Sequence, residues 1–261
     1  MAFFDKLFKK KICSICGGEI GLLGNRKLED GNMCKECAAK LSPWFSDRRS
    51  STVEEIAAQL EYREENKSAV AAFHTTRVLG ENTRILLDED ACKFMVTDER
   101  NLTKANPDVL NFSQVTGCEL DIEEDRREAQ TEDAEGNSVS YNPPRYHYSY
   151  DFEIKIRVNH PYFDEISFRL NSSSVDTTED NPVPAYRKPD PQRNHSYMEY
   201  KNMGEEIKSI LLSARAQARD SAKEAAAPSK ASTAPGAALP PSPMQTGAVN
   251  TAAAPFKEVI L

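Results

Sequence analysis

Long apolar runs are missing from the 261-residue sequence. No stretch approaches the roughly 20 apolar residues that cross a bilayer, so we expect no membrane-spanning helix. The first lysines follow a short apolar patch, an order unlike that of a secretory signal. We therefore expect a cytoplasmic protein with reduced thiols, because disulfides are rare in that compartment.

An excess of positive charge is missing as well. The chain has 33 Lys and Arg against 41 Asp and Glu, a formal net charge of -8. General nucleic-acid binding needs a clustered excess of cations to neutralise phosphates, so this class is disfavoured. A local basic patch stays open, and its candidates are Lys6, Lys9, Lys10, Lys11, Arg26, Lys27, Arg48 and Arg49. A zinc-assisted nucleic-acid or membrane-surface binder is therefore the alternative function.

Catalytic motifs are the third absence. The sequence has neither a Gly-rich phosphate loop nor a Gly-x-Ser-x-Gly turn. Its four histidines are scattered, at His74, His147, His160 and His195. We interpret Asp151, Glu153 and Asp164 as outward positions of strands. The sequence predicts no catalytic residue and no enzyme.

Two Cys-x-x-Cys pairs are present, formed by Cys13, Cys16, Cys34 and Cys37. Each pair can turn both sulfurs toward one point, about 2.3 Å from a tetrahedral ion. A lone pair also serves thioredoxin-like redox enzymes, whereas two pairs at this spacing favour zinc. Four thiolates leave no open position for water, so we predict one structural Zn²⁺ ion and no catalysis at the metal.

Small residues surround the two cysteine pairs. Gly17 and Gly18 follow the first pair, and Gly24-Asn25 offers a hairpin tip. The stretch 38–41 has the composition of a short helix, and Pro43 stops it. A knuckle, a hairpin and a second knuckle at a helix start predict a treble-clef-like finger.

A helix is predicted from about residue 51 to 73. Thr52 and Glu55 form a capping box at its start. One apolar face recurs at helical spacing, through Val53, Ile56, Ala57 and Leu60. We interpret the acidic residues as a solvated face: Glu54, Glu55, Glu61, Glu64 and Glu65.

The middle of the chain alternates like strands. Residues 83–88 and 92–97 predict a hairpin around the turn Asp88-Glu89-Asp90. Alternation continues over 115–124, and the charge-dense stretch 123–137 is predicted to be an exposed loop. Cys92 and Cys118 lie inside strand patterns, which predicts buried core residues.

The clearest strand covers 148–158, and Ile166, Phe168 and Leu170 supply its partner. Prolines between 171 and 195 predict a long loop without regular structure. A helix resumes at Ser196. Its apolar stripe consists of Met203, Ile207, Ile210, Leu211 and Ala214, wide enough to cover a sheet.

Both ends of the chain have distinctive compositions. Beyond about residue 218, Ala, Pro, Ser and Thr dominate, which predicts disorder. The apolar residues 256–261 are either an unselected chain end or an element that captures a partner. Phe3, Phe4, Leu7 and Phe8 share a helical face beside lysines. That segment either packs on the domain or lies on an anionic lipid surface.

Two resemblances follow from these motifs. The run 13–45 resembles a small zinc-finger family found at the N-termini of uncharacterised bacterial proteins and classed as a domain of unknown function. Its four cysteines and the Gly17-Gly18 pair match that family's pattern. The middle is similar to pleckstrin-homology-like domains, which implies a bent, roughly seven-stranded barrel closed by a C-terminal helix.

The second resemblance also bears on lipid binding. A phosphoinositide site of this superfold needs basic side chains on the first hairpin loop. Here that loop is expected to be Asp88-Glu89-Asp90, so we expect no headgroup in the usual pocket.

Together these features predict an α+β chain in four parts. They are a zinc finger (1–49), a connecting helix (50–74), a pleckstrin-homology-like antiparallel β-barrel with its C-terminal helix (75–217), and a disordered tail (218–261). The predicted function is that of a non-catalytic zinc-binding adaptor that binds a protein or a membrane-associated partner.

Overall fold

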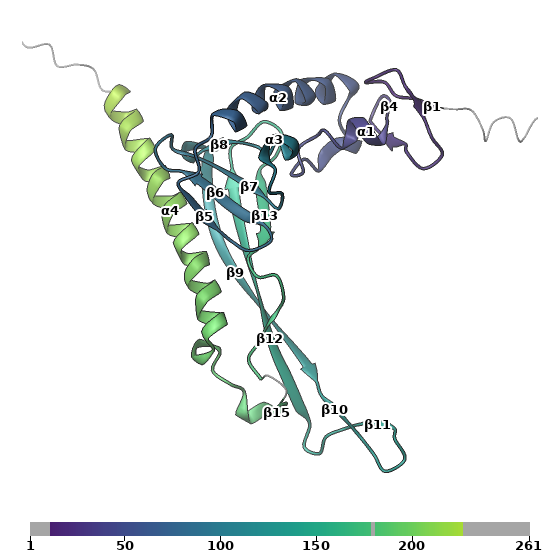
Figure 1. The fold of residues 1–261 in the computed structure, drawn as a ribbon, viewed down its shortest axis with the longest axis vertical. Helices are drawn as coiled ribbons and strands as arrows, with labels where there is room; N and C mark the ends of the chain where they lie inside the picture. Colours follow the sequence, from purple (N-terminus) through teal and green to yellow (C-terminus); the bar gives the residue numbers. More distant parts are fainter. Residues whose placement is uncertain (1–10, 179–180, 227–261) are drawn as a thin grey trace, which may run out of the picture. The chain divides into compact units, whose positions relative to one another are not determined.

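The computed structural model describes residues 11–178 and 181–226, with side chains to residue 217 (Figure 1). Two predicted segments lie outside the described residues: the apolar face of residues 3–8, and the part beyond 226 of the tail predicted for 218–261. The backbone of residues 218–226 continues the helix that begins at His195.

A four-cysteine knuckle region opens the described chain, as predicted. Its elements are β1 (Lys11–Ile12), β2 (Glu19–Ile20), β3 (Arg26–Lys27), β4 (Asn32–Met33), α1 (Lys35–Ala38) and the 3₁₀ turn η1 (Asp47–Arg49). β1 pairs with β2 and β3 pairs with β4, both antiparallel. Gly24-Asn25 therefore connects β2 to β3 and is not a hairpin tip. The short helix begins at Lys35, earlier than the composition of 38–41 predicts, because Cys34 caps it by accepting the backbone N–H of Cys37.

Helix α2 (Val53–Ala72) begins with the predicted capping box. The Glu55 backbone N–H donates to Thr52 Oγ1 over 3.2 Å, and the Glu55 carboxylate accepts the Thr52 backbone N–H over 2.8 Å. All five glutamates of the predicted solvated face are exposed.

The buried face of α2 is more polar than predicted. It consists of Ile56, Gln59, Arg63, Asn66 and Val70, whereas Ala57 is exposed. Arg63 and Asn66 are buried because they bond to the segment 106–109, which apolar periodicity alone cannot reveal. The face predicted from Val53, Ile56, Ala57 and Leu60 is therefore only partly correct.

The first sheet is antiparallel, in the order β5-β6-β7-β8. Its strands are β5 (Arg77–Leu79), β6 (Arg84–Asp88), β7 (Lys93–Thr97) and β8 (Leu110–Asn111), with helix α3 (Leu102–Ala105) before β8. The predicted hairpin is β6–β7. The prediction that Cys92 is buried is wrong, because Cys92 lies in the exposed turn of this hairpin with φ 55°. The turn is instead held by the buried Asp88, which accepts the Ala91 backbone N–H.

The second sheet is organised around β12 (Arg145–Val158). Its other strands are β9 (Val115–Glu128), β13 (Glu165–Arg169), β14 (Val175–Asp176) and β15 (Val183–Pro184), and all pair with β12 in antiparallel fashion. The predicted pairing of the 148–158 strand with Ile166 and Phe168 is confirmed.

The prediction that 123–137 is an exposed loop is wrong, because most of this stretch is in strands. Residues 123–128 continue β9 opposite β12, and β10 (Gln130–Glu132) pairs with β11 (Ser138–Ser140) around a turn. Most of their side chains are exposed, so the sequence lacks apolar alternation although the backbone ladder persists.

The segment 171–195 is largely irregular, with short elements that the sequence reading missed. Besides β14 and β15 it contains the 3₁₀ turns η3 (Ala185–Arg187) and η4 (Pro191–Arg193). Pro191 suits the first position of η4, where no N–H is needed. Helix α4 (His195–Ala226) follows.

Helix α4 packs on the sheets through its predicted stripe. Ile207 and Leu211 are fully buried in the core built by both sheets, and Met203, Ile210 and Ala214 pack partly against it. A Cβ on Gly204 would lie 2.6 Å from Leu120 Cδ1, so glycine allows α4 to approach β9 closely. Cys118 is buried in this core, as predicted.

Candidate metal centre

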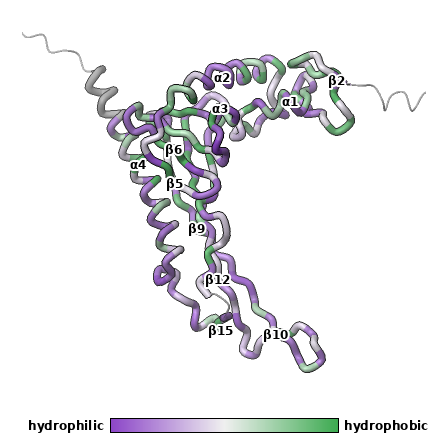
Figure 2. Tube along the Cα trace, viewed as in Figure 1, coloured by the Kyte–Doolittle hydropathy of each residue, from purple (hydrophilic) through white to green (hydrophobic). Residues whose placement is uncertain are grey.

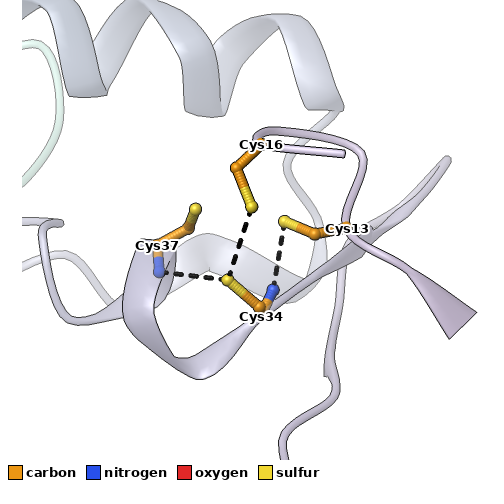
Figure 3. Close-up of side chains that lie close together, drawn as sticks. All are labelled: Cys13, Cys16, Cys34 and Cys37. Carbon is orange, nitrogen blue, oxygen red and sulfur yellow. Dashed lines mark hydrogen bonds between the residues drawn. The ribbon is translucent and has the colours of Figure 1, made fainter. Parts of the chain in front are cut away.

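The four predicted ligands converge on one point (Figure 3). Cys13 follows β1, Cys16 lies in the turn before β2, Cys34 caps α1 and Cys37 belongs to α1. Their sulfur atoms all lie within 4.8 Å of one another. The two Cys-x-x-Cys pairs, whose first cysteines are 21 positions apart in the sequence, therefore form a single cluster of four thiols.

The spacing of the sulfurs suits a tetrahedral ion. Cys16 Sγ lies 3.8 Å from Cys34 Sγ. A tetrahedron with metal–sulfur bonds of about 2.3 Å has edges of about 3.8 Å, so this pair already has the required separation.

Backbone N–H groups point at the sulfurs. The Cys34 N–H donates to Cys13 Sγ over 3.3 Å, and the Cys37 N–H donates to Cys34 Sγ over 3.4 Å. Gly17 makes the first turn possible with φ 72°, and its N–H donates to the Cys13 carbonyl over 2.9 Å. These donors stabilise negative charge on sulfur, as in thiolate metal sites.

The pKa values of the thiols differ because the four sulfurs lie close together in different surroundings. Burial raises the pKa of Cys13, but N–H donors from Cys16, Cys34 and Ile15 outweigh it and lower the value to about 6. Burial, followed by the sulfur of Cys34, raises the pKa of Cys37. For Cys34 the Cys37 N–H acts to lower the pKa, yet burial and the neighbouring Glu36 and Cys13 side chains raise it overall. A divalent cation would replace these shared protons.

The cluster is anchored in a small core of its own. Cys13, Cys34 and Cys37 are buried, while Cys16 is exposed. Leu28 and Met33 are fully buried beside them, and Ile56 of α2 joins the same core. The first turns of α2 therefore complete the knuckle region.

The histidines lie apart from the cysteines. Within residues 11–178 and 181–217, no other group of three or more Cys, His, Asp or Glu side chains converges as a metal site would. His160 packs among aromatic rings, 4.1 Å from the Phe163 ring centre and 5.0 Å from that of Tyr62. Burial lowers the pKa of His160.

The carboxylates predicted to be outward strand positions have structural partners where they lie on strands. Asp151 accepts from Asn171 Nδ2 over 2.9 Å, and Glu153 accepts from Lys155 Nζ over 3.2 Å. Asp164 is exposed in the connection before β13 and is not on a strand.

A buried polar cluster was missed by the sequence reading. Asp108 accepts from Arg63 Nη1 over 2.7 Å, from Ser42 Oγ over 2.8 Å and from Tyr62 Oη over 3.2 Å. These residues come from the end of the knuckle region, from α2 and from the segment before β8. A charged residue on a helix usually faces solvent, so the sequence offered no sign that this Arg and Asp meet.

Comparisons with known proteins match the knuckle region alone. A domain of unknown function, DUF4428, matches residues 11–59. The match extends into α2, in agreement with the place of Ile56 in the core around the cysteines. No curated protein and no solved structure matches the chain. Among the described residues, no helix combines the length and apolar character needed to cross a membrane.

Proposed function

We propose that this chain is a non-catalytic adaptor of the cytoplasm, in which one structural Zn²⁺ ion orders the finger and the sheet region binds a protein partner. Cys13, Cys16, Cys34 and Cys37 would hold the ion. Zinc with four thiolates would cross-link both knuckles and leave no coordination position for water. The separation of 3.8 Å between two of the sulfurs supports this assignment.

The strand order supports a pleckstrin-homology-like assignment for the sheet region. Four strands, β5 to β8, form one antiparallel sheet, the three longer strands β9, β12 and β13 of the second sheet follow, and α4 comes after the two-residue strands β14 and β15 of that sheet. This is the order of a seven-stranded domain with a C-terminal helix. A fold of this kind does not by itself give a function.

The loop chemistry of this region still disfavours a phosphoinositide headgroup. Because β5 precedes β6, the first hairpin loop is 80–83 and not 88–90, which revises the loop named from sequence. The loop contains Glu81 and no Lys or Arg, so the argument from charge is unchanged.

The observation that carries protein binding is the outer edge of β9. In the described part of the chain, β9 pairs with β12 alone. The Ala129 N–H donates to the Arg145 carbonyl over 2.8 Å, one step beyond the Glu128–Tyr146 pair. Backbone hydrogen bonds alternate along an antiparallel strand. The N–H and C=O groups of odd-numbered β9 residues therefore bond to β12, whereas those of even-numbered residues, such as Glu124, point away from β12.

An unpaired strand edge can accept an extended segment of another protein. Its backbone N–H and C=O groups supply a ladder, and side chains on alternate positions give selectivity. We assign the partner's segment to the edge of β9 that runs from 118 to 128. Backbone hydrogen bonds change little with salt, whereas contacts to phosphates weaken steeply. Salt dependence therefore separates this function from nucleic-acid binding.

Removing the backbone N–H of one residue, Glu124, tests whether the edge of β9 binds the partner. Glu124→Pro removes an outward donor without breaking the bonds to β12. Glu124→Ala is the matched control, because both variants lose the contacts of Glu124 with Tyr150 Oη and Lys188 Nζ. In cross-linking captures from the native host, we expect one partner to be recovered by the wild type and by Glu124→Ala, and to be lost with Glu124→Pro.

Two results would contradict this proposal. If Glu124→Pro and Glu124→Ala recover the partner equally and have equal thermal stability, the edge of β9 is not part of the interface. Recovery of nucleic acid without protein, with steep loss in salt, would favour the alternative function.

A further inference from the structure

The finger presents two leucines to solvent. Leu22 and Leu23 follow β2 and are 89% and 93% exposed. The Gly24 N–H donates to the Gly21 carbonyl over 3.0 Å, which closes a tight turn with the leucines at its apex. The chain is hydrophobic where this loop follows β2 (Figure 2). Burial of a leucine contributes about 1.5–3 kcal/mol, so these two adjacent exposed side chains can stabilise contact with an external apolar surface.

Cationic residues lie beside the base of this loop, where Arg26 Nη1 donates to the Leu23 carbonyl over 3.4 Å. Arg26 and Lys27 form β3, and Arg48 and Arg49 belong to η1. Arg48 Nη1 donates to the Lys27 carbonyl over 2.7 Å, which fixes η1 beside β3. Partial burial, then the positive charges of Arg26 and Arg49, lowers the pKa of Arg48, in keeping with a close cationic group.

These cations are not neutralised within the described residues. No ion pair joins any of the four to a carboxylate of residues 11–178 or 181–217. The acidic residue Asp30 instead accepts the Val53 N–H over 2.8 Å at the start of α2. Leu22 and Leu23 therefore form an apolar apex, and the four cations beside its base form a basic collar.

We propose that the loop at residues 21–25 inserts Leu22 and Leu23 into the surface of an anionic lipid bilayer, with Arg26, Lys27, Arg48 and Arg49 on the phosphate headgroups. Aliphatic side chains suit the acyl boundary, and cations suit the negative surface above it. This inference goes beyond the proposed adaptor function. It rests only on the part of that function in which zinc orders the finger.

Other occupants fit the loop less well. Single-stranded nucleic acid is held by aromatic stacking, and the apex carries aliphatic residues with no ring. A stable protein interface buries about 800 Å² on each partner, far more than two leucines at a turn supply. The lipid surface uses both the apolar apex and the collar.

The test is cosedimentation of the full, zinc-loaded chain with vesicles. Phosphatidylcholine vesicles with and without phosphatidylglycerol provide the anionic and neutral surfaces. We expect strong preference for the anionic vesicles and at least a tenfold loss of binding in the double variant Leu22→Ser, Leu23→Ser. Lys27→Gln and Arg49→Gln should each cost about fivefold, the effect of one charge near such a surface.

Tyr186→Ser is the matched control for exposed apolar area. Tyr186 is 79% exposed but lies in η3, outside the finger, so its loss should leave vesicle binding unchanged. Zinc content equal to wild type shows that the leucine variant keeps a folded finger. Glu124→Pro should bind vesicles normally, so failure of the protein-binding proposal and failure of this one are distinguishable.

Direct insertion has its own readout. Leu22→Trp should shift its emission to the blue and be quenched by brominated phosphatidylglycerol, against the background of the single native Trp44. Unchanged vesicle binding by the double leucine variant would overturn the proposal. So would binding to oligonucleotides in place of vesicles, or a loss of Glu124-dependent protein capture caused by the leucine variant.

Discussion

Arg63 and Asp108 form an ion pair inside the protein, with Nη1 and Oδ1 2.7 Å apart and side chains 6% and 0% exposed. Arg63 Nε also donates to the Lys40 carbonyl over 3.2 Å, and Ser42 Oγ donates to the other oxygen of Asp108. The pair thus joins α2, the end of the knuckle region and the segment before β8. A buried pair adds little over apolar packing, but breaking it strands a charge.

Arg63→Ala is therefore expected to lower the free energy of unfolding by about 3–5 kcal/mol, because Asp108 stays buried without its cation. Chemical denaturation of the full chain measures the change. Lys67→Ala is the control: its ion pair with Glu64 is on the surface of the same helix, where such pairs contribute about 0–1 kcal/mol. Equal effects of both substitutions would show that the buried pair has no special role.

A shortened chain that starts near residue 50 and ends near 217 should still unfold cooperatively. The large core between the sheets and α4 remains complete, apart from the contact of Trp44. Stability should fall below that of the full chain, because Asp108 loses Ser42, Arg63 loses the Lys40 carbonyl and Ile56 becomes exposed. Circular dichroism during thermal unfolding checks this. A broad, non-cooperative transition would mean that finger and sheets fold as one unit.

Replacing any one of Cys13, Cys16, Cys34 or Cys37 by Ser should remove most of the zinc, which we expect at about one ion per chain. Structural zinc contributes on the order of 10–16 kcal/mol in finger peptides, so the apo finger should unfold locally. Elemental analysis measures the metal. Cys92→Ser is the control, since Cys92 is an exposed thiol outside the cluster and its loss should leave the zinc content unchanged. Wild-type protein without zinc, with a disulfide in either pair under reducing conditions, would refute the site.

Asp88 should make stability fall at low pH. Backbone N–H bonds from His74 and Ala91 lower the pKa of Asp88 in the folded protein. The stabilisation is therefore complete above the unfolded pKa of about 3.9 and is lost as pH falls through the lower folded pKa.

Asp88→Asn should accordingly lose less stability than the wild type between about pH 5 and pH 3, because asparagine does not titrate. At neutral pH the variant should be the less stable of the two, since its uncharged oxygen accepts weaker hydrogen bonds. Parallel pH dependences of unfolding would contradict a role for this carboxylate.

The cysteine cluster could be predicted from sequence because its geometry is local to two short turns. The capping box at Thr52 is local in the same sense, and both predictions hold. The β12–β13 pairing was predictable because one face of β12 alternates without interruption from Tyr148 to Val158.

Other features depend on partners far away in the sequence. Arg63 and Asp108 are 45 positions apart, and no local pattern distinguishes a buried Arg on a helix from a solvated one. Residues 123–128 extend β9 because β12 offers a backbone ladder beside them, although their own charges are typical of a loop. Cys92 was predicted to be buried from its place in an alternating run, but the hairpin turn extends two residues beyond the last charged residue, Asp90, and β7 begins only at Lys93.

The antiparallel pair of β9 and β12, a two-stranded ribbon, limits how insertions can change its length. Side chains alternate faces along a strand, so adding one residue to one arm would reverse every position beyond it. Adding two residues to β9 near Arg126 and two to β12 near Tyr146 would lengthen the ribbon and leave the buried register at Phe152 and Ile154 intact. Natural relatives should therefore differ in ribbon length by even numbers of residues, with odd changes confined to the turn that joins β10 to β11.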